Sequence, residues 1–81
     1  YKVQLIAVKK YDGGTHRRYD GVRNMARIDT EYIIAKKLTR VLLADYFTLS
    51  EARTALEAVQ LNGFGGAFII RYEDGERIGR I

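Results

Sequence analysis

Residues 39–72 constrain the fold of this chain more than any other segment, because they spell out a strand, a helix, a helix stop and a second strand in succession. Thr48 and Glu51 have the spacing of a capping box: the hydroxyl accepts from the Glu51 amide, and the carboxylate reaches back to the Thr48 amide. Asn62-Gly63 supplies the left-handed stop that ends many helices, and Phe64 can fold back as its apolar contact. The segment therefore predicts a helix with two defined ends.

One side of this helix is apolar and is expected to be buried. Leu49, Ala52, Leu56 and Val59 recur at steps of three and four residues, whereas polar side chains occupy the opposite side. The flanking strands are rich in branched and aromatic residues, which suit a pleated surface. Beyond the second strand, an Asp-Gly pair is a strong hairpin signal, so we expect a short return strand over residues 77–81.

The first half of the chain has weaker signals. The patterns of residues 1–8 and 28–34 predict two strands. The segment between them begins with residues 9–19, which are polar and contain a Gly-Gly turn, so we expect an exposed loop there. A short helix over residues 20–26 would bury Val22 and either Met25 or Ala26. The order is then β-α-β-β-α-β, so we predict an α+β domain of the ferredoxin-like or RNP-like class, with a four-stranded antiparallel sheet and both helices on one face.

Composition limits the kinds of protein that this chain can be. It has 81 residues, of which 47% are hydrophobic and 30% charged, the balance of one folded domain. It has no cysteine, which excludes disulfides and thiolate chemistry, and no apolar run long enough to cross a membrane. Because the chain starts at Tyr1 without a methionine, we expect residues 1–81 to be a single domain cut from a longer protein.

A βαββαβ sheet has one face without helices, and the side chains on that face decide what the domain can bind. Alternation along the strands assigns to the helix side Val3, Leu5, Val41, Leu43, Ala67 and Ile69. It assigns to the open side Gln4, Ile6, Val8, Leu38, Arg40, Leu42, Phe68, Ile70 and Tyr72. In the last strand the same alternation sends Arg71 inward, unless the strand twists or ends there. An apolar open face of this kind usually meets a ligand or a partner.

Several short motifs follow one another in a characteristic order. They are Val3-Gln4-Leu5, Arg40-Val41, Phe47-Thr48-Leu49-Ser50-Glu51-Ala52, and Asn62-Gly63-Phe64 ahead of Ala67-Phe68-Ile69-Ile70. Together they resemble the SPOR (sporulation-related repeat) domain, and residues 38–43 with the tail at residues 74–77 are similar to versions in Bacteroidetes envelope proteins. The resemblance implies a non-catalytic periplasmic module that binds peptidoglycan, with a preference for glycan strands stripped of their stem peptides at division septa.

The resemblance also implies which residues bind the glycan. The family positions fall on Gln4, Ala7, Leu38, Arg40, Phe68 and Tyr72. Amide and guanidinium groups can donate to sugar hydroxyls and carboxylates, and aromatic rings offer flat surfaces to pyranose rings. The chain departs from the family at Ile6 and Ala44, where larger residues replace glycines and narrow the approach of a ligand, and at Val8, which replaces an aromatic residue.

Two other functions compete with glycan binding. An RNA-binding domain has the same topology, and the net charge of +4 and the string Gly63-Phe64-Gly65 are in its favour. That string follows the second helix, however, whereas the RNA motif that it resembles precedes it, so we expect no nucleic-acid partner. A protein-interaction module is the second alternative, because Ile6 and Val8 on an open face would suit a partner protein.

The sequence shows no catalytic or cofactor-binding constellation. His16 is the lone histidine and lies in a polar loop, where a surface role is the ordinary one. Glu73, Asp74 and Glu76 are typical of a solvated turn rather than a cation site. We therefore expect a non-enzymatic monomer, without cofactor or metal, that is not inserted in a membrane.

Overall fold

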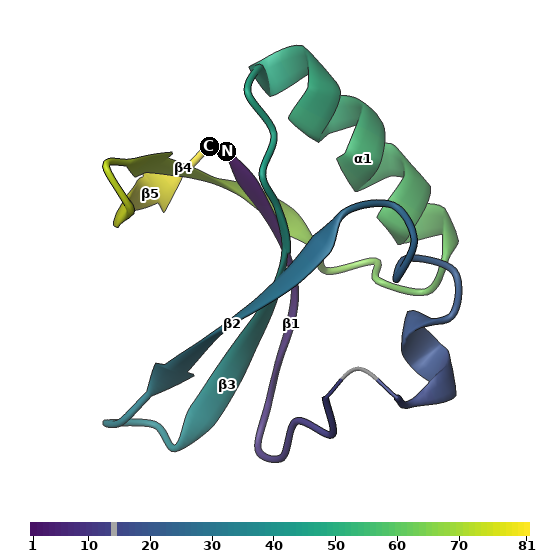
Figure 1. Ribbon diagram of the computed structural model, residues 1–81, viewed down its shortest axis with the longest axis vertical. Helices are drawn as coiled ribbons and strands as arrows, with labels where there is room; N and C mark the ends of the chain where they lie inside the picture. Colours follow the sequence, from purple (N-terminus) through teal and green to yellow (C-terminus); the bar gives the residue numbers. More distant parts are fainter. Residues whose placement is uncertain (14) are drawn as a thin grey trace.

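The computed structural model describes residues 1–13 and 15–81, which form a curled antiparallel sheet with one α-helix packed on one side (Figure 1). In chain order the elements are β1 (Lys2–Val8), the 3₁₀ helix η1 (Arg17–Tyr19), β2 (Arg27–Ile33), β3 (Leu38–Ala44), α1 (Leu49–Leu61), β4 (Phe68–Glu73) and β5 (Glu76–Arg80). The strands lie in the order β2-β3-β1-β4-β5, and each neighbouring pair is antiparallel. Within the described residues, no helix is long and apolar enough to cross a membrane.

The predicted fold class, a βαββαβ fold with four strands and two helices, is wrong. The described residues form five strands and one α-helix. The return strand expected at the C-terminus is a full member of the sheet, because β5 pairs with β4, and Asp74 and Gly75, at φ values of 51° and 80°, make the turn between them. The helix expected over residues 20–26 is absent, and a series of turns follows η1 instead.

Gly21 disfavours the expected helix, and it lies where this segment meets α1. A Cβ atom added to Gly21 would lie 2.1 Å from Oδ1 of Asn62, so the backbone at Gly21 comes directly against the residue that caps the C-terminus of α1. Glycine in a helix interior also costs about 1 kcal/mol relative to alanine. Val22 is fully buried as predicted, Met25 is 36% exposed, and Ala26 packs partly against the core.

Tyr19 fills part of the space where the first helix was expected. Its ring stacks on that of Phe64 and meets that of Tyr11 edge-on, with 5.9 Å between ring centroids in both pairs. Tyr19 is only 2% exposed, so the prediction that residues 9–19 form an exposed loop is wrong at this residue. In the predicted Gly-Gly turn, Gly13 has the left-handed φ of 77° that glycine adopts easily, and Gly14 lies outside the described residues.

Helix α1 begins and ends where the sequence predicts. The Glu51 amide donates to Oγ1 of Thr48 at 3.1 Å, and the Thr48 hydroxyl donates to the Glu51 carboxylate, which does not reach the Thr48 amide as expected. At the other end, the amide of Phe64 donates to the carbonyl of Val59 at 3.1 Å, and Gly63 has a φ of 97°. This is a Schellman motif, whose apolar contact joins Phe64 and Val59 in the core.

A β-bulge in β1 reverses the alternation of its side chains. Gln4 pairs with Leu42 of β3, but Ile6 pairs with Val41, so Leu5 is an extra residue in the ladder. As a result Ile6 and Val8 pack against the core, and their predicted place on the open face is wrong. The residues predicted on the helix side are all confirmed as core, and they are Val3, Leu5, Val41, Leu43, Ala67 and Ile69.

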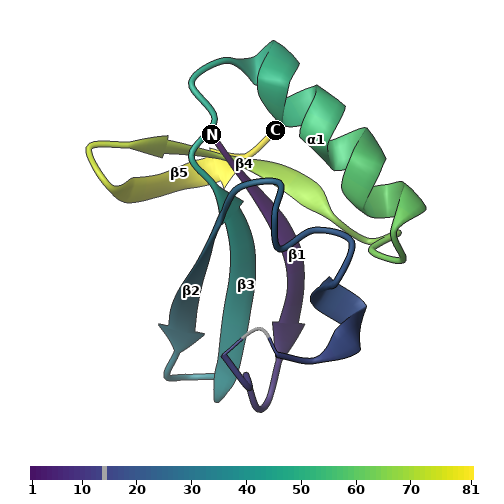
Figure 2. The ribbon, with the colours of Figure 1, turned by 45° about the vertical axis from the view of Figure 1, so that its right-hand side comes forward.

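The sheet curls so that its two ends approach each other on the side away from α1. Figure 2 shows the β4–β5 hairpin bent away from the direction of β2 and β3. The hydroxyl of Tyr72 on β4 donates to the carboxylate of Glu31 on β2, across the two strands that separate them. A second bulge, at Ile78 of β5, adds to the local twist. Arg71, whose orientation the alternation left open, is exposed and pairs with Glu73.

If Tyr19 belongs to the core, its removal should destabilise the whole protein. We expect Tyr19→Ala to lower the free energy of unfolding by about 3 kcal/mol, because truncating a buried aromatic side chain leaves a cavity. Urea denaturation followed by circular dichroism measures this change. Tyr32→Ala is the matched control, since Tyr32 is 61% exposed, and we expect it to change stability by less than about 1 kcal/mol. Equal effects of the two substitutions would contradict the packing of Tyr19.

Candidate ligand-binding face

The face opposite α1, here called the concave face, collects polar side chains from all five strands. Strand pairing places on it Lys2, Gln4, Ala7, Arg27, Asp29, Glu31, Leu38, Arg40, Leu42, Phe68, Ile70, Tyr72, Arg77 and Arg80. Its floor is apolar, because Leu42 and Ile70 are fully buried although no helix covers them. The polar side chains cover this floor. The concave face is therefore not the exposed apolar surface that the sequence predicts.

Glu31 is the hub of the polar side chains over the centre of the face. Its Oε1 lies 3.5 Å from Nη1 of Arg40 and 3.7 Å from Nη1 of Arg77, and its Oε2 accepts from the hydroxyl of Tyr72. Arg77 also donates through Nη2 to Oε1 of Gln4 at 3.1 Å. Gln4 is 8% exposed, whereas the Glu31, Arg40 and Arg77 side chains are each 28% exposed. The network thus joins all five strands and leaves part of each charged group open to solvent.

A second set of ion pairs lies along one end of the face. Nζ of Lys2 is 3.1 Å from Asp29, and Arg27 bridges Asp29 and Asp45 at 2.7 and 2.9 Å. Hydrogen bonds from the Arg27 guanidinium, with help from Lys2, lower the pKa of Asp29 despite its partial burial, and the same two carboxylates raise the pKa of Arg27. Both shifts favour the charged forms, of the Asp29 carboxylate and of the Arg27 guanidinium.

Cations lie over both aromatic rings of the concave face. Nζ of Lys2 is 4.4 Å from the ring centroid of Tyr72, and the guanidinium carbon of Arg80 is 4.2 Å from that of Phe68. Such contacts are favourable because the ring face carries negative charge. In the free protein each ring thus already has a partner.

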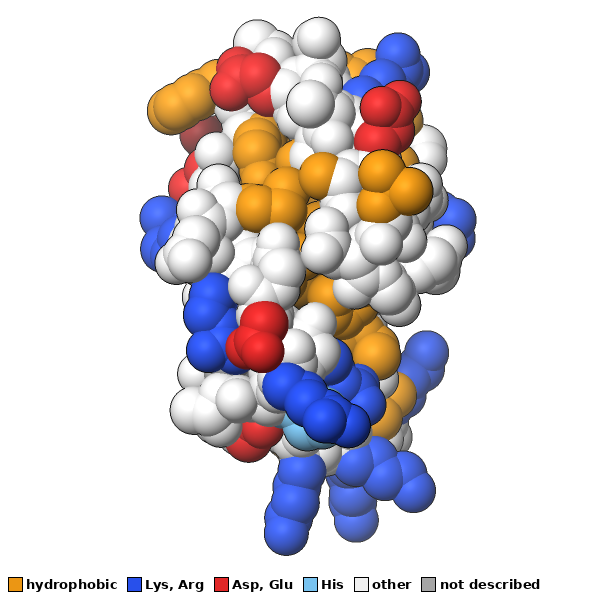
Figure 3. All heavy atoms as spheres, turned by 90° about the vertical axis from the view of Figure 1, so that its right-hand side faces the viewer, with side chains coloured by type: hydrophobic (Ala, Val, Ile, Leu, Met, Phe, Trp, Pro, Cys, Tyr) orange, Lys and Arg blue, Asp and Glu red, His pale blue; other side chains and the backbone are white. Residues whose placement is uncertain are grey.

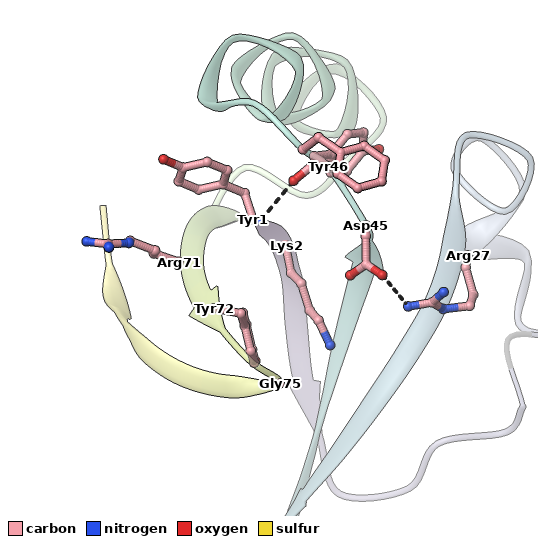
Figure 4. A pocket seen from close by; sticks show the side chains of 9 residues that line it. Tyr1, Lys2, Arg27, Asp45, Tyr46, Arg71, Tyr72 and Gly75 are labelled. Atoms are coloured by element: carbon pink, nitrogen blue, oxygen red, sulfur yellow. Dashed lines mark hydrogen bonds and ion pairs between the residues drawn. The ribbon is translucent and has the colours of Figure 1, made fainter.

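A cleft opens at the end of the concave face, between the β4–β5 hairpin and the segment that follows β3 (Figure 4). Its volume is about 550 Å³, and it is lined by Tyr1, Lys2, Arg27, Asp45, Tyr46, Phe47, Arg71, Tyr72 and Gly75. In Figure 4 the Lys2 side chain extends between Tyr72 on one side and the Asp45–Arg27 pair on the other. A second hollow, of about 320 Å³, adjoins Gln4, Ala7, Phe68 and the loop at residues 63–66.

The residues predicted to bind a ligand share this face. Gln4, Arg40 and Tyr72 are joined through Arg77 and Glu31. Ala7 lies opposite Arg40, and Phe68 lies opposite Gln4. Leu38 is on the same face but pairs with Ile33 at the far end of β3, outside the network.

Sequence reasoning missed several members of the network. Glu31, Arg77, Lys2, Asp29 and Arg80 were not among the predicted residues, although the alternation of Arg27, Asp29 and Glu31 along one strand is a visible signal of a shared charged face. His16 was predicted to be a surface residue, and no metal site was predicted. His16 accepts from the amide of Arg18 through Nδ1, and in the part of the chain that the structure describes no three acidic, histidine or cysteine side chains are grouped to hold a metal ion.

No family model matches the chain, and no curated protein or solved structure matches it either. The resemblance to SPOR domains therefore rests on the sequence motifs alone and stays a prediction.

The contact between Glu31 and Tyr72 can be tested through the ionisation of the Tyr72 hydroxyl. Burial and the hydrogen bond to Glu31 raise the pKa of Tyr72 to about 12 from its usual value of 10.0. We expect Glu31→Gln to lower this pKa, because the neighbouring negative charge that opposes ionisation is lost. The measurement is an ultraviolet titration of tyrosinate, in which the signal of Tyr72 is the difference between each protein and the same protein with Tyr72→Phe.

The raised pKa of Tyr72 also makes the stability of the protein depend on pH. Since the folded-state pKa is above that of the unfolded chain, the contribution of Tyr72 is present below about pH 10 and is lost as the pH rises to about 12. Tyr72→Phe should therefore make the fall in stability over this range smaller. Glu73→Gln, on the same hairpin but paired with Arg71, is the control and should leave the pKa of Tyr72 unchanged.

Proposed function

We propose that this chain is a non-catalytic module that binds the glycan strands of peptidoglycan, stripped of stem peptides, along its concave face. The observation that carries the proposal is the gathering of Gln4, Ala7, Leu38, Arg40, Phe68 and Tyr72 on one face. These residues come from three strands and are far apart in sequence. A shared face is what a common ligand requires.

The chemistry of the face suits a polymer of amino sugars that carries carboxylates. Arg40 and Arg77 are partly exposed and can donate to lactyl carboxylates and acetamido carbonyls, with Gln4 holding Arg77 in place. Glu31 can accept from sugar hydroxyls. Phe68 and Tyr72 offer ring faces to pyranose rings once Arg80 and Lys2 move aside.

The bulge reduces one obstacle to this function. At Ile6 a glycine of the family is replaced by a larger residue, which should narrow the approach of a ligand, but the Ile6 side chain packs partly against the core and lines only the hollow next to Gln4 and Phe68. Val8 also packs partly against the core. The protein-interaction alternative depended on these two side chains being on the open face, so it loses its main support.

The RNA-binding alternative also loses support. Phe64, the aromatic residue of the RNA-like string, is 6% exposed and belongs to the helix stop. Glycan binding would place the protein in the bacterial periplasm as a monomeric targeting module.

Pelleting with purified sacculi tests the proposal. We expect the wild-type protein to pellet with sacculi, and more of it to pellet after amidase treatment has removed the stem peptides. Arg40→Ala and Gln4→Ala should each weaken pelleting about tenfold, because each removes a hydrogen-bonding group worth roughly 1 to 3 kcal/mol. Arg53→Ala, at an exposed position on α1, is the matched control and should pellet like the wild type.

Circular dichroism and urea denaturation of each variant show whether it is folded. Absence of pelleting by the folded wild-type protein, or equal loss in Arg53→Ala and Arg40→Ala, would contradict glycan binding at the concave face. Binding to single-stranded RNA without binding to sacculi would favour the RNA alternative instead.

A further inference from the structure

Four lysines gather at one end of the sheet, away from the cleft. Lys9 and Lys10 follow the last residue of β1, and Lys36 and Lys37 form the turn between β2 and β3. The pairs Val8–Thr39 and Ile33–Leu38 bring these two segments to the same edge. Figure 3 shows lysine and arginine side chains gathered at the lower end of the molecule, several of them projecting beyond it.

These lysines differ from the cations of the concave face in having no carboxylate partner. Lys2, Arg27, Arg40 and Arg77 each lie within 4.0 Å of an acidic group. Among the described residues no acidic group lies within that distance of the four lysines, all of which are exposed. Asp12 is the acidic residue in the same part of the β1–η1 connection. The lysines therefore make this end strongly positive.

The β2–β3 turn also exposes apolar side chains close to these lysines. Ile34, at the tip of the β2–β3 turn, is 81% exposed, and Tyr32 just before it is 61% exposed. The turn is held by hydrogen bonds from the amides of Lys36 and Lys37 to the carbonyls of Ile33 and Ile34, at 3.2 and 3.3 Å. The hairpin thus exposes an isoleucine and an aromatic ring, with Lys36 and Lys37 in the same turn and Lys9 and Lys10 at the end of β1 beyond β3.

We infer that this lysine end, formed by Lys9, Lys10, Ile34, Lys36 and Lys37, docks on the surface of a lipid bilayer that contains anionic headgroups. Lysines on flexible stems meet headgroup phosphates as point charges, and an apolar tip enters the boundary between headgroups and acyl chains. Two signals of this kind, one electrostatic and one apolar, are what reversible membrane attachment requires. A soluble polyanion such as RNA would satisfy the lysines and leave Ile34 in water.

Docking at this end leaves the cleft accessible. The lysines lie beyond the ends of β1 and the β2–β3 hairpin, next to Ala7 and Leu38, whereas the cleft lies between the β4–β5 hairpin and the segment that follows β3. The protein can therefore contact a bilayer and a ligand in the cleft at the same time. The inference does not depend on which polymer the concave face binds.

Co-sedimentation with vesicles tests the inference. We expect the protein to bind vesicles of phosphatidylcholine with phosphatidylglycerol, to bind vesicles of pure phosphatidylcholine much less, and to lose binding as salt rises. Lys36→Gln with Lys37→Asn should weaken binding by about 25-fold, since each lysine near an anionic surface contributes roughly fivefold. Asparagine is chosen at position 37 because Lys37 has a φ of 53°, which asparagine tolerates well. Ile34→Ser should also weaken binding.

Matched variants distinguish docking through the lysine end from non-specific electrostatic or hydrophobic binding to vesicles. Leu61→Ser removes an apolar side chain that is 89% exposed on α1, and Arg53→Gln removes an exposed charge on the same helix. Both should bind vesicles like the wild type. Absence of binding to anionic vesicles, equal binding to neutral ones, or equal loss in the control variants would overturn the inference. Loss in the lysine variant without loss in Ile34→Ser would also overturn it, because binding would then be electrostatic alone and Ile34 would not enter the bilayer. Sacculus pelleting by the same variants reports separately on the concave face.

Discussion

The bulge at Leu5 is the constraint on which both faces of this sheet depend. Without it, strict alternation along β1 would send Ile6 and Val8 to the face opposite α1 and Ala7 to the core. With it, the bulky residues contribute to the core and a small residue lies beside Arg40. A bulge also bends its strand, which is consistent with the curl that brings β2 and the β4–β5 hairpin together. One extra residue thus serves the packing on one side and the binding surface on the other.

On the concave face, the curl of the sheet buries apolar side chains that no helix covers. A flat sheet of this composition would expose Leu42 and Ile70 to water, yet both are fully buried. The cover consists of charged and hydrogen-bonded side chains from opposite ends of the sheet, centred on Glu31. Because these side chains remain in contact with solvent, their mutual attraction is modest, and the apolar floor beneath them supplies much of the stabilisation.

Local signals predicted the helix and its ends, because caps are made by residues a few positions apart: Thr48 with Glu51, and Gly63 with Phe64. They did not predict the bulge, since neither Leu5 nor Ile6 is a glycine or another residue that marks a bulge. The close approach between Gly21 and Asn62 was also not predictable, because these residues lie far apart in the chain. The same holds for the hub, because Tyr72 and Glu31 are separated by 41 residues and meet only through the curl. Alternation along the strands predicted that Gln4 and Arg40 share the face without the helix, but no local signal indicated that Glu31 pairs with Arg40.

The cations over Phe68 and Tyr72 determine how a ligand could enter this face. Because Arg80 and Lys2 already lie over the rings, a sugar of the proposed glycan would replace an existing contact and would not fill an empty place. The gain in each exchange would be only the difference between two favourable contacts, so a single sugar would be held briefly. A polymer that makes several such exchanges could stay bound while each unit dissociates and rebinds. If the concave face binds glycan as proposed, it would therefore hold long strands better than fragments.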